Sequence, residues 1–264
     1  PPGTGKTHTL LEKVKEYINK GTPLTRIGYF AFTRKAAREA RDRFLEEFTH
    51  LKKKDLKYFQ TLHSFAFNYL GLKEEDVMQE EHYRSIGESI GVRIKYASYE
   101  INEYNGIFTS NSEYLNIVNL ASVRKISALD LNEHLGKIER FKVDIISKEI
   151  ESYKKTYNLI DFTDMIQKFI NCGRCPKFDV IFIDEAQDLS LIQWNMLKKL
   201  QENADDVYIA GDDDQAIFGW AGADVESFIN FEAEEIPLTK SNRIPKEVQE
   251  IALKIISKIN DRID

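Results

Sequence analysis

Hydrophobic and polar positions form two different patterns along the chain. In the first and last thirds, short apolar runs are followed by amphipathic stretches, which is typical of strands and helices packed over a parallel sheet. We expect strands at residues 27–32, 58–62, 180–183 and 207–210. We expect helices at residues 6–18, 36–48 and 191–200, and a last helix opened by Pro245 in its first turn.

The middle of the chain lacks strand alternation. From about residue 73 to residue 158 it is charged and rich in tyrosine, which favours a mostly helical insertion that splits the α/β domain. After about residue 236 we expect a new strand and helix that open another domain. We therefore predict the first part of the α/β domain at residues 1–72, the insertion at 73–158 and the second part of the domain at 159–235. The start of the next domain is predicted at residues 236–264.

Composition and charge narrow the class of protein. At 264 residues and 42% hydrophobic content, the chain can bury a substantial core in one or two domains. It has no apolar run long enough to span a membrane and does not begin like a signal peptide, so we expect a cytoplasmic protein without a membrane partner. The net charge of −6 argues against a lysine-covered binder of polyanions. A local basic groove remains open, because affinity for phosphates depends on where the cations lie.

A glycine-rich segment opens the chain. It is PPGTGKT, a phosphate-binding loop that lacks only the leading glycine, which we expect one position before Pro1. Gly3 and Gly5 let backbone N–H groups turn toward phosphate oxygens, and the helix that follows presents its positive N-terminus. Lys6 would reach the β- and γ-phosphates, and the Thr7 hydroxyl would bind Mg²⁺. The alternative is a Gly/Pro turn that happens to precede a helix.

Acidic residues follow an apolar strand in the last third. The run VIFIDEAQD places Asp184 and Glu185 at a strand end, where parallel α/β sheets carry their catalytic groups. Asp184 would hold Mg²⁺ directly or through water, and Glu185 would polarise the attacking water as general base. The alternative is an acidic surface turn, which is weakened because the same chain opens with a phosphate loop.

A third segment joins a strand to a polar turn and two aromatic residues. It is VYIAGDDDQAIFGWAGA, in which Gln215 could donate to the γ-phosphate or hold the attacking water. Phe218 and Trp220 could offer flat faces to nucleobases, and such stacking contributes about 1–3 kcal/mol per base without regard to sequence. The alternative places both rings in the core, which burial tendencies favour for an arbitrary aromatic pair.

Seven segments taken in order resemble the helicase motifs of superfamily-one UvrD/Rep-like enzymes. They are PPGTGKT, AFTRKAA, TLHSFA, DFTDM, IDEAQD, GDDDQAIFGWAGA and SNRIP. The resemblance runs from Pro1 to about Val248, except within the helical insertion, where only the position matches. It implies an α/β, RecA-like P-loop parallel sheet with a helical insertion and the start of a second RecA-like domain.

The resemblance also implies roles for individual residues. ATP and Mg²⁺ are the expected cofactors, and single-stranded DNA and duplex junctions are the expected partners. Expected catalytic residues are Lys6, Glu185, Gln215 and Arg243, of which Arg243 matches the arginine that reaches the γ-phosphate across the domain cleft. Expected nucleotide-binding residues are Gly3, Thr4, Gly5, Lys6, Thr7, Gln215 and Arg243. Expected DNA-binding residues are Phe32, Thr33, His63, Ser64, Phe218 and Trp220, although His63 could equally be a buried structural histidine.

The sequence departs from the family pattern at two positions. Asn242 stands where the family usually has a tyrosine that stacks on adenine, and Ala221 stands where it has an arginine after the motif tryptophan. The upstream adenine-binding segment and the downstream motifs with the second arginine finger lie outside this sequence. We therefore expect it to fold in large part but not to unwind DNA without the missing parts.

These features predict an ATP-dependent DNA helicase that moves along single-stranded DNA, with the 3′-to-5′ direction implied by the resemblance alone. One alternative is a phosphate-loop kinase or simple NTPase with its aromatic residues in the core. Another is a non-catalytic DNA-binding module. Stimulation of ATP hydrolysis by single-stranded DNA would separate these possibilities.

Overall fold

A parallel sheet forms the centre of the molecule. The structure is a computed structural model that describes residues 3–94, 110–136 and 138–256. Within these residues the sheet has the order β2-β1-β3-β4. Its strands are β1 (Ile27–Ala31), β2 (Phe59–Gln60), β3 (Phe178–Asp184) and β4 (Ala204–Ile209). This confirms the parallel α/β class, and each of these four strands overlaps one of the predicted apolar runs.

The topology creates a switch point at the carboxyl edge of the sheet. From β1 the chain crosses to β2 on one side, whereas from β3 it crosses to β4 on the other. Ala31 of β1 lies level with Asp184 of β3, so the loops after these two central strands start side by side and then diverge. Ligands of open α/β sheets bind at such points.

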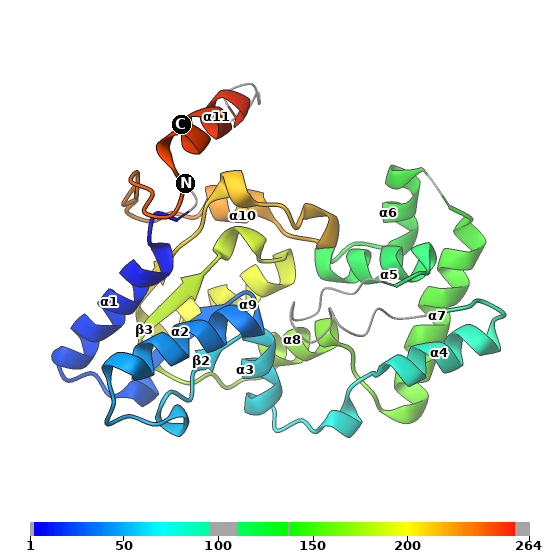
Figure 1. The fold of residues 1–264 in the computed structure, drawn as a ribbon. Helices are drawn as coiled ribbons and strands as arrows, with labels where there is room; N and C mark the ends of the chain where they lie inside the picture. Colours follow the sequence, from blue (N-terminus) through cyan, green and yellow to red (C-terminus); the bar gives the residue numbers. More distant parts are fainter. Residues whose placement is uncertain (1–2, 95–109, 137, 257–264) are drawn as a thin grey trace.

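Helices cover both faces of the sheet, as Figure 1 shows. On one face, α1 (Lys6–Asn19) and α2 (Arg34–Glu47) bury Val14, Ala40 and Phe44 against the strands. On the other, α3 (Leu62–Tyr69), α8 (Phe162–Asn171) and α9 (Leu191–Gln201) pack over the strands. Both faces of β1 are buried, which explains why its sequence is continuously apolar rather than alternating.

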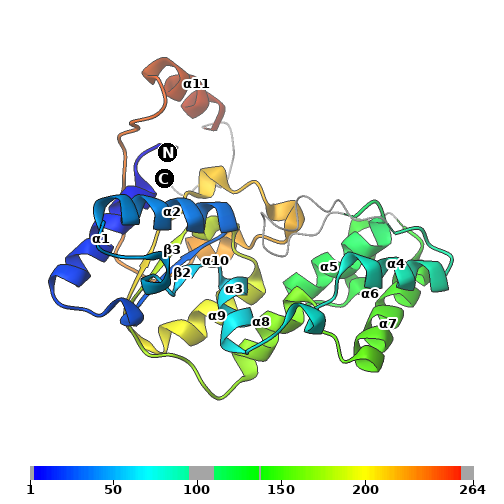
Figure 2. The same ribbon diagram turned by 60° about the horizontal axis from the view of Figure 1, so that its bottom comes forward.

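The predicted insertion is mostly helical in the residues that the structure describes, and Figure 2 shows its helices grouped beside the sheet. They are α4 (Glu80–Ser89), α5 (Glu113–Arg124), α6 (Ala128–Leu135) and α7 (Arg140–Tyr157). The group has small cores of its own, such as the one around Ile117, Ala121, Leu131 and Val143. Its two ends meet in a parallel bridge between Val77 and Ile160. The boundaries at residues 73 and 158 remain predictions.

Shorter elements and one late helix complete the described chain. Helices α10 and α11 span Val225–Ile229 and Lys246–Ile256. The 3₁₀ turns are η1 (Leu24–Arg26), η2 (Lys53–Asp55), η3 (Glu74–Asp76), η4 (Ala186–Asp188), η5 (Asp213–Gln215) and η6 (Gly219–Ala221). No helix in the described ranges is both long enough and apolar enough to cross a membrane.

Two expected elements differ from the structure. The strand expected at residues 58–62 ends at Gln60, because the Thr61 hydroxyl accepts a hydrogen bond from Ser64 N at 3.1 Å and starts α3. The strand expected after residue 236 is not formed within the described residues before α11. Ile236 is 69% exposed, so the apolar run there has neither a neighbouring strand nor a core to pack against.

Candidate functional site

The first end of the site is the glycine-rich loop before α1. Gly3 and Gly5 have φ angles of 74° and 88°, a left-handed conformation that residues with a Cβ rarely adopt. The segment around Arg243 lies over this loop: Asn242 N donates to Gly3 O at 2.9 Å, and a Cβ on Gly3 would collide with the Cβ of Arg243. The chain thus brings the phosphate loop and the expected arginine together, with Arg243 itself exposed.

Asp184 is the centre of the expected metal site. The hydroxyl groups of Thr7 and Tyr29 donate to its Oδ2 at 2.7 and 2.8 Å. Asp184 is 2% exposed, and this burial raises its pKa despite the two hydrogen bonds. A buried carboxylate beside a threonine hydroxyl offers the hard oxygen donors that Mg²⁺ prefers, and Mg²⁺ sites commonly use one or two protein oxygens with phosphates and water. The residues present therefore fit the ion.

Asp212 gathers the two residues expected at the γ-phosphate. Lys6 Nζ lies 3.5 Å from Asp212 Oδ2, and the side-chain amide of Gln215 donates to the same oxygen. Both donors are thus directed at one anionic oxygen, and the same two donors suit an oxygen of a phosphate group. Asp212 itself follows β4 and is buried. Lys6 and Asp212 are 206 positions apart in the sequence. They meet because β4, which leads to Asp212, lies beside β3 in the sheet.

The backbone of Glu185 is held in an uncommon conformation. Its φ of 55° lies in the left-handed region, which costs a residue other than glycine about 1–3 kcal/mol and often marks a functional position. Gln187 Nε2 donates to Glu185 Oε2 at 3.0 Å and to Asp188 Oδ2 at 3.2 Å. Gln187 Oε1 accepts from Asp212 N at 3.0 Å. This one buried amide therefore fixes the expected general base relative to the loop after β4.

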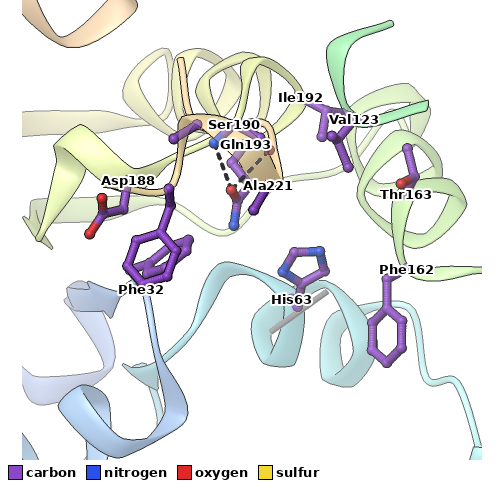
Figure 3. A pocket seen from close by; sticks show the side chains of 12 residues that line it. Phe32, His63, Val123, Phe162, Thr163, Asp188, Ser190, Ile192, Gln193 and Ala221 are labelled. Carbon is purple, nitrogen blue, oxygen red and sulfur yellow. Dashed lines mark hydrogen bonds between the residues drawn. The ribbon is translucent and has the colours of Figure 1, made fainter. Parts of the chain in front are cut away.

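A small pocket next to η4 is lined by three of the residues expected to meet DNA, which are Phe32, His63 and Phe218. The Phe32 ring lies 5.4 Å from the Phe218 ring, which lies 6.2 Å from the Trp220 ring. Phe32 is buried, whereas Trp220 is 57% exposed. Figure 3 shows how the lining side chains surround the pocket. They are Phe32, His63, Val123, Phe162, Thr163, Asp188, Ser190, Ile192, Gln193, Phe218, Ala221 and Ala223.

Two titratable side chains in this pocket are shifted toward their neutral forms. Burial, with a smaller effect of the Arg34 charge, lowers the pKa of His63 to about 4. Burial and the neighbouring Glu185 charge raise the pKa of Asp188 to about 7. His63 Nδ1 and Asp188 Oδ1 are buried and have no hydrogen-bond partner among the residues described here. The pocket thus combines aromatic side chains with buried polar atoms that have no hydrogen-bond partner among the described residues.

Two further expected DNA-binding residues make local hydrogen bonds. Thr33 Oγ1 caps α2 by accepting from Ala36 N at 3.0 Å. Ser64 Oγ lies 3.0 Å from the Thr61 hydroxyl, which donates to it. Both side chains are half-buried at helix starts. Their expected contact with DNA remains a prediction.

Sequence reasoning missed four residues that organise the site: Tyr29, Gln187, Asp188 and Asp212. A signal existed for Tyr29, because a tyrosine in a fully buried strand needs a partner for its hydroxyl. Gln187 and Asp188 carried a weaker signal, since they are polar residues that directly follow a buried strand end. Asp212 belongs to the acidic run that was recognised only as a block.

Comparison with known proteins gives one family match and several relatives. Residues 1–235 match the model of the UvrD/REP helicase N-terminal domain. The chain is 23% identical over 279 residues, 99% of the chain, to an ATP-dependent DNA helicase PcrA of Leuconostoc citreum. It is 28% identical over 256 residues, 86% of the chain, to a probable DNA helicase of Mycoplasma pneumoniae. It is 25% identical over 284 residues, 99% of the chain, to a DNA helicase II of Haemophilus influenzae.

The matched parts are much shorter than these relatives. The alignments cover 37, 45 and 38% of the three relatives in the order given. The comparisons confirm the resemblance inferred from the seven sequence motifs.

Proposed function

Because the chain belongs to the UvrD/Rep helicase family, we propose that the protein hydrolyses ATP and couples hydrolysis to movement along single-stranded DNA. The 3′-to-5′ direction and action at duplex junctions in the cytoplasm are part of this proposal. The relatives are named DNA helicases, and this supports extending their activity to this protein.

One observation carries the proposal: Gln187 joins the two halves of the site. Its amide group contacts Glu185 on the phosphate side, Asp188 in the aromatic pocket and the backbone of Asp212. Phosphate chemistry and an exposed aromatic surface are thus connected through one rigid, buried side chain. A simple NTPase has no need for the second half, and a pure DNA-binding module has no need for the first.

The chain's residues divide the work of hydrolysis among them. Thr7 and Asp184 would hold Mg²⁺, which neutralises phosphate charge when bound. Lys6 and Gln215 would orient the γ-phosphate by hydrogen bonds to its oxygens. Glu185 would accept the proton of the attacking water, a role for which its carboxylate is already oriented by Gln187. Arg243 would approach from the segment that lies over Gly3.

DNA would bind across the other half of the site. Trp220 is the most exposed of the expected DNA-contacting rings, and the Phe218 ring lies 6.2 Å from it. A base stacked on an exposed indole gains about 1–3 kcal/mol whatever its sequence, which suits an enzyme that moves along arbitrary DNA. Phe32 and His63 line the pocket behind these rings.

The test is the ATPase rate of the full-length protein with and without single-stranded DNA of mixed sequence. We expect clear stimulation by DNA, and strand separation on a duplex with a 3′ single-stranded tail in preference to a 5′ tail. ATP hydrolysis that is indifferent to DNA would favour the simple NTPase. DNA binding without hydrolysis would favour the binding module.

A further inference from the structure

A contact links the helical insertion to the loop that carries the aromatic pair. Arg124, the last residue of α5, donates from Nη2 to the carbonyl oxygen of Gly219 at 2.9 Å across 95 positions of sequence. In Figure 1, α5 lies next to the segment that precedes α10. Gly219 stands between Phe218 and Trp220, so this hydrogen bond fixes a peptide group between the two rings.

Packing at Gly222 gives independent evidence for the same contact. Gly222 has a φ of 99°, and a Cβ there would collide with Val123 Cγ2 and approach Leu120 Cδ1 at 3.4 Å. Helix α5 therefore lies against the backbone of the turn and leaves no room for a side chain at Gly222. Val123 also lines the pocket, together with Ala221 (Figure 3).

The turn is held at one end by the loop after η4. Ala223 forms an antiparallel bridge with Ser190, and Asp224 N donates to Leu189 O at 2.8 Å.

The part of the turn that carries the two rings is closed by local hydrogen bonds, from Ala221 N to Phe218 O at 2.9 Å and from Gly222 N to Gly219 O at 3.1 Å. The hydrogen bond from Arg124 to Gly219 O adds a contact to a neighbouring helix at the peptide group between the rings. A charged donor is stronger than a neutral one, so this bond can hold that part of the turn in place.

Helix α5 is a firm support for such a donor. Leu115 and Ala121 on α5 are buried in the cores of the insertion, and Lys125 ends the helix in a left-handed conformation with φ 58°. Arg124 is half-buried, so its guanidinium is partly shielded from water and its hydrogen bond is worth more than one on an open surface.

We propose that Arg124 is a positioning residue that holds the turn at Gly219 so that Trp220 is presented to single-stranded DNA. The insertion then takes part in DNA binding through the protein backbone, without Arg124 itself contacting DNA. This inference rests on the proposed function only where it names DNA as the occupant. The contact of Arg124 with the turn is independent of that function.

The test uses the full-length protein labelled with 5-fluorotryptophan. The ¹⁹F resonance that disappears in Trp220→Phe is assigned to Trp220. In DNA-free protein, we expect Arg124→Ala and the more conservative Arg124→Gln to shift or broaden this resonance. Arg140→Ala is the matched control, because Arg140 is an exposed arginine of the same insertion that pairs only with Glu133 among the described residues. It should leave the resonance unchanged.

DNA affinity supplies the second readout. We expect Arg124→Ala to weaken binding of single-stranded DNA by about 3- to 10-fold, a typical effect for the loss of one protein hydrogen bond. In a double-mutant cycle with Trp220→Ala, the two losses should be strongly non-additive, because both act through the same ring. Circular dichroism and thermal unfolding identify any variant that fails to fold, and Arg124→Gln then replaces Arg124→Ala.

Two outcomes would overturn the inference. An unchanged Trp220 resonance in both folded variants would mean that Arg124 does not position the turn. Fully additive losses would mean that Arg124 contacts DNA itself. If Trp220→Ala leaves DNA affinity intact while Arg124→Ala moves the resonance, the positioning contact stands and the DNA-binding part of the proposed function fails.

Discussion

The two halves of the site differ in their side chains, which are polar and hydrogen-bonded in one half and mainly aromatic in the other. Around Asp184 and Asp212, polar groups converge: two hydroxyl groups, an ammonium group and a side-chain amide point at two buried carboxylates. Around Phe32 and Trp220, the surface is aromatic. The buried Nδ1 atom of His63 has no hydrogen-bond partner among the described residues.

This difference reflects what each half has to recognise. Phosphates and a metal ion need charges at fixed positions, which a hydrogen-bonded network provides in advance. A strand of arbitrary sequence needs flat surface and few directional groups. Gln187 lies between the two halves and contacts both. The contrast can be tested by changes that affect one half and spare the other.

The largest expected effect is on catalysis. Replacing Glu185 with glutamine should retain nucleotide binding but lower the ATPase rate of the full-length protein by about 10²–10⁴-fold, because the general base is lost. Glu202→Gln, at an exposed position after α9, is the matched control and should have no effect. An unchanged rate in Glu185→Gln would remove Glu185 from the mechanism.

A second effect concerns the pH dependence of stability. The pKa of Asp188 is about 7 in the folded chain and near its ordinary value when unfolded, so the folded chain binds an extra proton between these limits. Asp188 therefore contributes stability that is fully present below its unfolded pKa and is lost as pH rises through about 7. Relative to Asp188→Asn, wild type should lose about 2–3 kcal/mol of unfolding free energy between pH 5 and pH 8.

Urea denaturation at several pH values measures this difference. His63 acts in the opposite direction, because its lowered pKa makes stability rise with pH between about 4 and its ordinary value. Comparing wild type with Asp188→Asn cancels the His63 contribution, which both chains share. Parallel pH profiles for the two chains would show that Asp188 ionises normally.

A third effect should appear only in DNA binding. Trp220→Ala should weaken affinity for single-stranded DNA by about 1–3 kcal/mol, with little dependence on base sequence. Phe141→Ala removes a ring that is 71% exposed on the insertion and serves as the control. Loss of thermal stability in Trp220→Ala, together with normal DNA affinity of the folded protein, would place the indole in the core instead.

The smallest effect tests the hydrogen-bond network at the phosphate end. Tyr29→Phe removes one donor to the buried Asp184 carboxylate, while Thr7 still donates to it. We expect the free energy of unfolding at neutral pH to fall by about 1 kcal/mol, measured by urea denaturation. Tyr157→Phe, at a ring that is 61% exposed, is the control. A Tyr29→Phe variant as stable as wild type would contradict the network.

Local features of the site could be predicted from the sequence, whereas contacts across the fold could not. Thr7 and Asp184 were placed correctly at the start of a helix and the end of a strand, because each position follows from its neighbours in the chain. Their meeting at 2.7 Å depends on how α1 packs against β3. The role of Tyr29 depends likewise on strand register.

The contact of Arg124 with Gly219 could not have been predicted at all. It depends on where the insertion docks, and no pattern of apolar positions encodes the docking of one surface on another. Thr61 is a case where the signal was local, because a threonine hydroxyl can cap a helix by accepting from the backbone N–H three residues later and so shorten the preceding strand.

The bridge between Val77 and Ile160 has a consequence for how this protein can change over evolutionary time. Met78 N donates to Ile160 O at 2.8 Å, and Ile160 N donates to Asp76 O at 3.0 Å, so the long excursion of the chain is closed at its base. Lengthening a closed loop is inexpensive, since each doubling costs only about 0.6 kcal/mol of chain entropy. Insertions or deletions far from this base should therefore be tolerated by the sheet, which leaves selection free to reshape the excursion wherever it does not touch the turn at Gly219.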